Sequence, residues 1–164
     1  MYQPYPGGAQ MPEPSRPPAP RSIIVAVRAM YVGVAASLIG IVIDMTTLSA
    51  TKATIKSRSP NLTAAQVASA EHVLVGAFVA GGLIGAALWL WMAQSSRAGK
   101  AWARVVSTVL FAIDTIEQIA GAATPQGGGA RVYSIVVWLI GCVAIVFLWQ
   151  RSSTDYFRGT RAYQ

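Results

Sequence analysis

Three carboxylates lie inside long apolar stretches of this chain, where charged groups are costly. Asp114 and Glu117 interrupt the stretch AWARVVSTVLFAIDTIEQIAGA, and Asp44 lies near the end of an earlier stretch. A carboxylate at the centre of a bilayer costs about 2.5 to 3.5 kcal/mol on insertion scales, so it has to face protein or water instead of lipid. These residues are therefore the candidate proton- or cation-binding site.

Helical spacing places Asp114 and Glu117 on one face, because residues three apart are neighbours on a helix. The cost of burying them is offset by Arg131, by His72, by a bound cation or by protonation. Two interpretations stay open: the site of a small proton- or cation-coupled transporter or cation sensor, or a hydrogen-bonded polar seam between helices. The expected face comprises Ser107, Phe111, Asp114, Glu117, Gln118 and Gly121.

Motifs for catalysis are missing from the sequence. It contains no Walker loop and no GxSxG, HExxH or paired-cysteine pattern. With one histidine and one cysteine, Cys142, it cannot form a metal site of several His or Cys ligands. We expect no enzyme activity, no cofactor and no metal.

The composition is typical of a membrane protein. Of the 164 residues, 54% are hydrophobic and 12% are charged, whereas soluble domains contain about 25% charged residues. A net charge of +7 would also suit a nucleic-acid partner, but the basic residues flank apolar stretches instead of clustering on one face. We therefore expect the lipid bilayer as the partner and no nucleic acid.

The apolar stretches predict an all-α bundle of four transmembrane helices within residues 23–150. A hydrocarbon core about 30 Å thick needs roughly 20 helical residues. A capping-box pattern from Thr63 to Gln66 predicts a short outer helix that runs into the second crossing. The segment TPQGGGAR predicts a flexible turn before the last crossing. The four crossings are expected at about 28–50, 72–93, 102–123 and 132–150.

The two ends of the chain have different compositions. Residues 1–22 hold seven of the nine prolines and predict a disordered cytoplasmic tail. This tail is either a solvated spacer or a ligand for a groove on a partner protein. Residues 151–164 predict a short basic cytoplasmic tail.

Lysine and arginine counts predict the orientation. The two tails and the middle loop carry nine basic residues, and the other two loops carry four. Because basic residues stay on the cytoplasmic side, both termini are expected inside the cell, with the protein in the plasma membrane. Tryptophans anchor helix ends at the headgroup level, and such anchors are expected at Trp89, Trp91, Trp102 and Trp149.

Rows of small residues predict which helices pack closely. The second crossing has Ala77, Gly81 and Gly85 at every fourth position, and the first has Gly33 and Ser37. Small residues let helix backbones approach in lipid, so we expect these two helices to form a tight antiparallel pair. The alternative is that the same rows mediate a homo-oligomer or bind another membrane protein.

The stretch LWLWMAQSSRAGKAWARVVSTVLFAIDT, together with the Pro-rich amino tail and the opening RAMYVG at residues 28–33, resembles small actinobacterial four-helix membrane proteins. This resemblance implies an integral plasma-membrane location and nothing about chemistry. The sequence as a whole predicts an envelope protein that acts by interaction or scaffolding. The alternative is a small transporter that uses Asp114, Glu117 and Asp44.

Overall fold

A computed structural model describes residues 18–58, 61–122 and 128–160. These residues form helices and connecting turns with no strand, which confirms the all-α class. The helices are α1 (Arg21–Arg58), α2 (Ala64–Arg97), α3 (Ala101–Gly121), α4 (Gly128–Leu148) and α5 (Arg151–Thr160).

Three of these helices, α1, α2 and α4, are long and apolar enough to cross a membrane. A membrane location is thereby supported. Helix α3 is not in this group, because every stretch of membrane-spanning length within it contains Arg104, Asp114 and Glu117.

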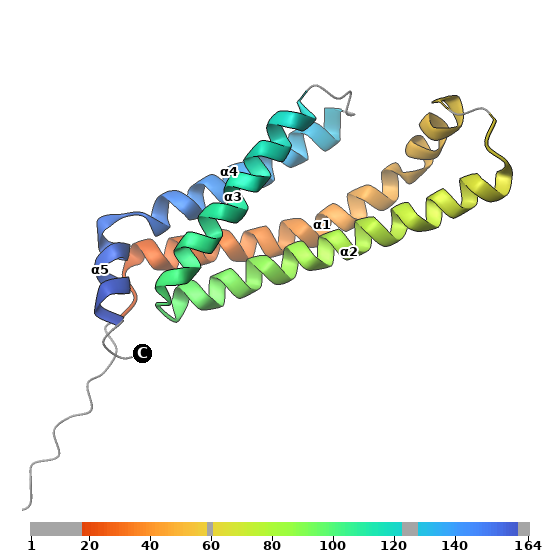
Figure 1. Cartoon of the computed structure of the whole chain (residues 1–164). Coiled ribbons are helices and arrows are strands. Elements are labelled where there is room, and N and C mark those ends of the chain that lie inside the picture. Colours follow the sequence, from red (N-terminus) through yellow and green to blue (C-terminus); the bar gives the residue numbers. More distant parts are fainter. Residues whose placement is uncertain (1–17, 59–60, 123–127, 161–164) are drawn as a thin grey trace, which may run out of the picture.

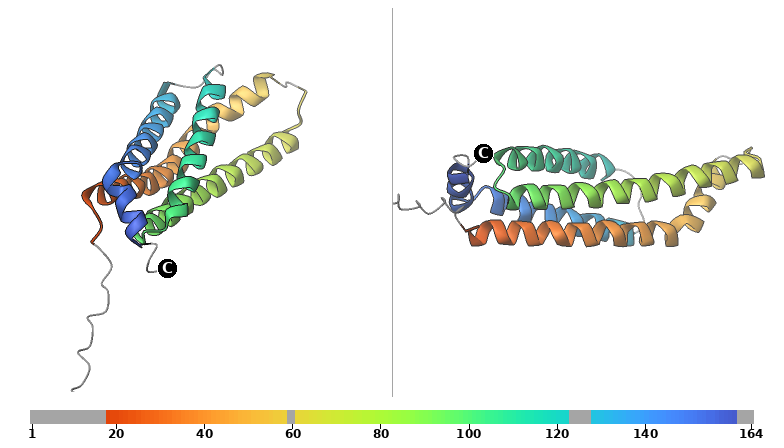
Figure 2. Two further views of the ribbon diagram at one scale, coloured as in Figure 1. Left: turned by 60° about the vertical axis from the view of Figure 1, so that its left-hand side comes forward. Right: turned by 90° about the horizontal axis from the view of Figure 1, so that it is seen from below.

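The long helices are arranged as two antiparallel hairpins (Figure 1). The α1–α2 hairpin is the longer one, and α1 also packs along α4. The hairpins meet at the end where α5 lies and diverge toward the other end (Figures 1 and 2).

The helix boundaries differ from the expected crossings: α1 and α2 extend beyond them at both ends, whereas α3 and α4 end slightly before the expected residues 123 and 150. Helix α1 begins at Arg21 and continues to Arg58, although residues 28–50 were expected. Helix α2 is continuous from Ala64, and its capping box is confirmed: the backbone N–H of Thr63 donates to Gln66 Oε1 at 2.9 Å. Helix α4 begins at Gly128, inside the segment predicted to be a flexible turn. Residues 1–17, most of the predicted Pro-rich tail, lie outside the described residues.

The predicted close packing of α1 against α2 is present, but it uses a different row on α2. A Cβ atom at Gly82 would collide with the Ile41 side chain, and one at Gly85 would lie 3.4 Å from Ser37 Oγ. Gly33 faces the ring of Trp89 in the same interface.

Two residues of the predicted row lie elsewhere. Ala77 is exposed, and a Cβ atom at Gly81 would meet nothing within 4 Å. One residue corresponds to 100° of rotation on a helix, so the contact row of α2 includes Gly82 in place of Gly81.

Residues 151–160 of the predicted basic tail form helix α5. Its buried side chains are Ser153, Tyr156, Phe157 and Thr160, which recur at i, i+3, i+4 and i+7 as in an amphipathic helix. The Ser153 hydroxyl donates to Ser22 Oγ at 2.7 Å, which joins α5 to the start of α1.

The turn between α2 and α3 is joined to the same helix. The Tyr156 hydroxyl donates to the Arg97 carbonyl at 3.0 Å, and the Thr160 hydroxyl donates to the Gly99 carbonyl at 2.9 Å. Gly99 has φ +72°, a conformation that favours glycine. Helix α5 therefore ties together one end of the molecule.

Candidate functional site

Side-chain contacts within the α3–α4 hairpin fix the rotation of α3. The indole N–H of Trp138 donates to Thr115 Oγ1 at 3.0 Å, and the Gln118 amide donates to the Ser134 carbonyl at 3.1 Å. The rings of Phe111 and Trp138 stack with centroids 5.9 Å apart. With these groups directed at α4, Asp114 and Glu117 are held beside a space between the hairpins.

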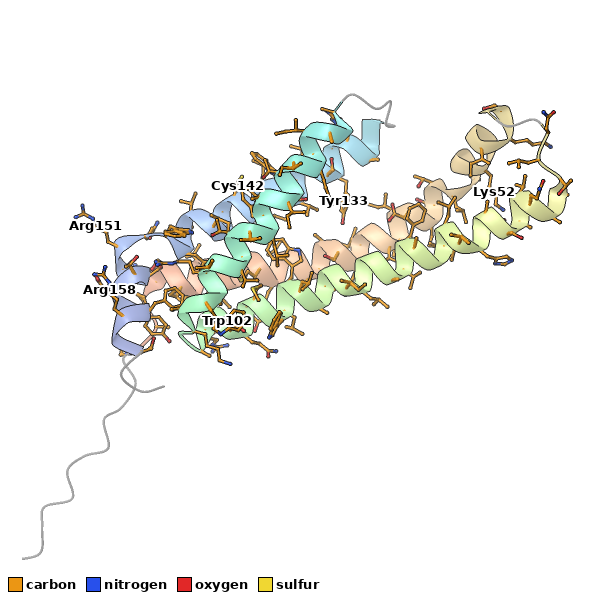
Figure 3. All side chains as sticks on the ribbon, in the orientation of Figure 1. Lys52, Trp102, Tyr133, Cys142, Arg151 and Arg158 are labelled. Carbon is orange, nitrogen blue, oxygen red and sulfur yellow. The ribbon has the colours of Figure 1, made fainter. Side chains whose placement is uncertain are left out.

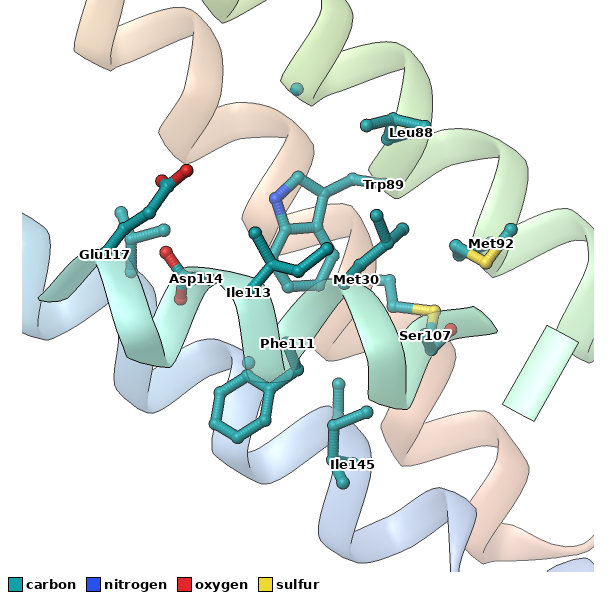
Figure 4. A pocket seen from close by; sticks show the side chains of 15 residues that line it. Met30, Leu88, Trp89, Met92, Ser107, Phe111, Ile113, Asp114, Glu117 and Ile145 are labelled. Atoms are coloured by element: carbon teal, nitrogen blue, oxygen red, sulfur yellow. The ribbon is translucent and has the colours of Figure 1, made fainter. Parts of the chain in front are cut away.

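That space is a cavity of about 320 Å³ lined by residues of α1, α2, α3 and α4. Asp114 and Glu117 lie toward one end of it, and Ser107 lies toward the other (Figure 4). Between them the walls are apolar and aromatic, with Met30 and Trp89 contributed by the other hairpin.

The polar groups of the cavity are not neutralised by the described residues. Asp114 is half-buried and Glu117 is exposed, and neither forms an ion pair with a described side chain. Ser107 is 7% exposed, and its Oγ has no hydrogen-bond partner among the residues that the structure describes. An orphaned buried hydroxyl costs about 1 to 3 kcal/mol, so a ligand or water in the cavity would stabilise it.

The groups expected to compensate the carboxylates lie away from them. The Arg131 guanidinium donates to the carbonyl of Gly121 at 3.2 Å, at the end of α3. His72 is exposed on α2, and its neighbour Glu71 is paired with Lys52 of α1. Neither Arg131 nor His72 is among the residues that line the cavity.

Asp44 is separate from the other two carboxylates. It is half-buried on α1 near the Tyr133 hydroxyl, with which it interacts electrostatically, and it does not line the cavity. That hydroxyl donates to the Ala36 carbonyl at 2.6 Å and holds α4 against α1. The structure therefore brings Asp114 and Glu117 together and leaves Asp44 outside.

Trp89 is the main residue of the site that the sequence interpretation missed. It was expected to be a membrane-interface anchor, but its ring packs on Gly33 and lines the cavity. Trp91 and Trp102 fit the expected role better, since they are 52% and 39% exposed with rings 5.2 Å apart. The available signal was the spacing of Trp89 seven residues after Gly82, on the face that packs against α1.

The arrangement suits a cation more than a metal cluster. No group of three or more His, Cys, Asp or Glu side chains that could hold a metal ion occurs in the described part of the chain. Carboxylates beside aromatic faces attract organic cations by charge and by cation–π interaction. The cavity therefore has the chemistry to bind a small cation with apolar substituents.

Comparisons of the chain with protein-family models, curated proteins and solved structures found no match. The resemblance to actinobacterial four-helix membrane proteins stays a prediction.

Proposed function

We propose that this chain is a four-crossing plasma-membrane protein with both termini in the cytoplasm, and that its cavity binds a small hydrophobic cation in a proton- or cation-coupled transporter. The observation that carries the transport proposal is the position of Asp114 and Glu117 on the wall of an apolar cavity between the two hairpins.

The outer surface of α3 supports its assignment as the fourth crossing. Val105, Val109, Ile116 and Ile119 are 53 to 69% exposed and recur along one side of the helix. Asp114 faces the cavity instead of that side. An apolar exposed side combined with an inward polar side is the pattern of a helix that lines an intramembrane cavity.

The contacts of α5 support an even number of crossings. Ser22 at the start of α1 and Ser153 after the end of α4 are hydrogen-bonded, so both termini of the helical region lie at one end of the molecule. Arg97 and Lys100 of the α2–α3 turn are at this end too. By the positive-inside rule this end faces the cytoplasm.

The composition of the cavity favours an organic cation as its ligand. Trp89 and Phe111 provide aromatic faces, Met30 and Met92 provide polarisable apolar contact, and Asp114 provides the negative charge. Protonation of Asp114 removes that charge. Cation binding is therefore expected to weaken as the pH falls, which is the property that couples a cation to a proton.

The test is binding of benzyltrimethylammonium to the purified full chain in a nonionic detergent, measured by calorimetry at several pH values. We expect Asp114→Asn to weaken binding at least tenfold and to reduce its pH dependence, and Asp114→Asn with Glu117→Gln to remove the pH dependence. Asp155→Asn is the matched control, because Asp155 is exposed on α5 outside the cavity. Asp44→Asn is expected to change binding less than threefold. Unchanged, pH-dependent binding by Asp114→Asn would contradict the proposal.

Action by interaction in the membrane is a second candidate, supported by the exposed small residues of α2. Ala77 and Gly81 lie on an open surface where a second helix could approach closely. In a Cys142→Ala background, Ala77→Cys is expected to form a disulfide-linked dimer in membranes. Leu83→Cys, exposed at a different angle on α2, is the control. Equal or absent crosslinking at the two positions would exclude a homodimer through this row.

A further inference from the structure

A second pocket lies at the end of the molecule that carries α5, between the start of α1 and the end of α2. Its volume is about 430 Å³. Arg28 and Arg97 line it from the two helices, together with Tyr31 and apolar side chains that include Ile24 and Val27. No acidic side chain is among the described residues that line it.

Most of the described residues that line the pocket belong to the start of α1, and α2 contributes Arg97. Ile24, Arg28 and Tyr31 are spaced at i, i+4 and i+7, so they lie along one side of α1. The backbone of Arg97 is fixed by the hydrogen bond from Tyr156 to its carbonyl, and the start of α1 is fixed by the bond between Ser22 and Ser153. Both arginines therefore project from backbone that α5 holds in place.

The arginine side chains have no recorded protein partner. Neither Arg28 nor Arg97 forms a side-chain hydrogen bond or ion pair with a described residue, and both are exposed. A pair of guanidinium groups suits a phosphate group, because each presents N–H donors in a fork that matches its oxygens. The apolar wall beside them suits a ligand that is part hydrocarbon.

We propose that this pocket binds the phosphate of an anionic phospholipid from the inner leaflet. The proposed four-crossing topology places Arg97 at the cytoplasmic end of α2, where lipid phosphates lie. Arg28 lies about 10 Å along α1 from its first residue, Arg21, because each helical residue adds 1.5 Å. Basic pockets on the cytoplasmic side of transmembrane helices are suited to anionic headgroups. The bound lipid would brace α1 against α2. This inference rests on the proposed topology, but the site is separate from the Asp114 cavity, so lipid binding and cation binding can fail separately.

The test is the binding of short-chain phosphatidylglycerol to the full chain in a nonionic detergent, counted by native mass spectrometry, with phosphatidylcholine for comparison. We expect tighter binding of phosphatidylglycerol. An arginine that contacts the bound phosphate is expected to contribute about fivefold in affinity. Arg97→Gln is therefore expected to weaken binding about fivefold, and Arg28→Gln with Arg97→Gln about 25-fold.

The matched control removes the same charge from the same end of the molecule. Arg151 and Arg158 are exposed on α5 and do not line the pocket (Figure 3). Arg151→Gln with Arg158→Gln is expected to leave phosphatidylglycerol binding within twofold. An equal loss in the control would show that net charge, and not the pocket, attracts the lipid, and would overturn the proposal.

A competition arm separates a lipid from a free phosphate ester. A 100-fold excess of glycerol 3-phosphate is expected to leave phosphatidylglycerol bound, because the apolar wall favours the acylated ligand. Complete displacement would overturn the lipid assignment. Changing Arg28 and Arg97 to lysine keeps the charge but removes the guanidinium forks, so it is expected to restore only part of the binding that the glutamine variants lose. Full restoration, with helix content by circular dichroism unchanged, would overturn the assignment of the phosphate to the paired guanidinium groups.

Discussion

At the scale of single residues, Gly82 sets how closely α1 and α2 approach. A Cβ atom there would collide with the Ile41 side chain and lie 3.3 Å from the Ser37 carbonyl oxygen. Its neighbour Gly81 has open space around the same position. A substitution at Gly81 can therefore serve as the control for the same substitution at Gly82.

We expect Gly82→Ala to destabilise the protein by about 1 to 3 kcal/mol, the usual cost of overpacking a close contact. Gly81→Ala is expected to be neutral or slightly stabilising, because alanine has the higher helix propensity. Denaturation of both variants in mixed micelles, followed by circular dichroism, measures the difference. Equal effects would show that the rotation of α2 against α1 differs from the one described.

The carboxylates show how far residue-level reasoning from the sequence extends. Asp114 and Glu117 could be assigned to one face because their separation along a single helix fixes their relation. Their proximity to Trp89 depends on how α2 is rotated against α3, and no local pattern encodes that rotation. Asp44 was grouped with them by its expected depth alone, but the structure places it outside the cavity. Depth does not specify direction around a helix.

At the scale of elements, α5 is the part that sequence reasoning missed, although its pattern was present. The basic residues after position 150 predicted only a basic tail. The spacing of Ser153, Tyr156, Phe157 and Thr160 indicates a helix with one buried face. The three long apolar helices could be predicted because their apolar length is a strong signal. The helix ends could not be predicted, because polar residues such as those of α1 beyond residue 50 are compatible with a helix and with a loop.

Phe157 holds α5 on the bundle, since it is 2% exposed and belongs to the same buried cluster as Ile23 and Leu148. We expect Phe157→Ala to weaken the docking of α5 by about 3 to 5 kcal/mol, as for other buried phenylalanines. Hydrogen exchange is then expected to accelerate at residues 151–160 and to stay unchanged in the middle of α4. Arg158→Ala, at an exposed position of the same helix, is the control. Slow exchange in the Phe157 variant would show that α5 is held by its hydrogen bonds instead.

At the scale of the whole molecule, the number of crossings decides where the two ends lie. Hydropathy alone selects α1, α2 and α4, which would place the termini on opposite sides of the membrane. The hydrogen bond between Ser22 and Ser153 holds both ends of the helical region together, which fits the proposal that α3 crosses as well. The charges of α3 are compatible with that arrangement because Asp114 and Glu117 line the cavity.

Cysteine labelling measures this difference directly, because the chain has one cysteine to remove. In a Cys142→Ala background, Leu62→Cys in the α1–α2 connection is expected to react with an impermeant maleimide on intact cells. Pro18→Cys and Arg158→Cys, before α1 and on α5, are expected to react only after permeabilisation. The parent Cys142→Ala chain is expected to stay unlabelled. Labelling of Arg158→Cys but not of Pro18→Cys on intact cells would mean an odd number of crossings, with α3 outside the membrane and its carboxylates in water.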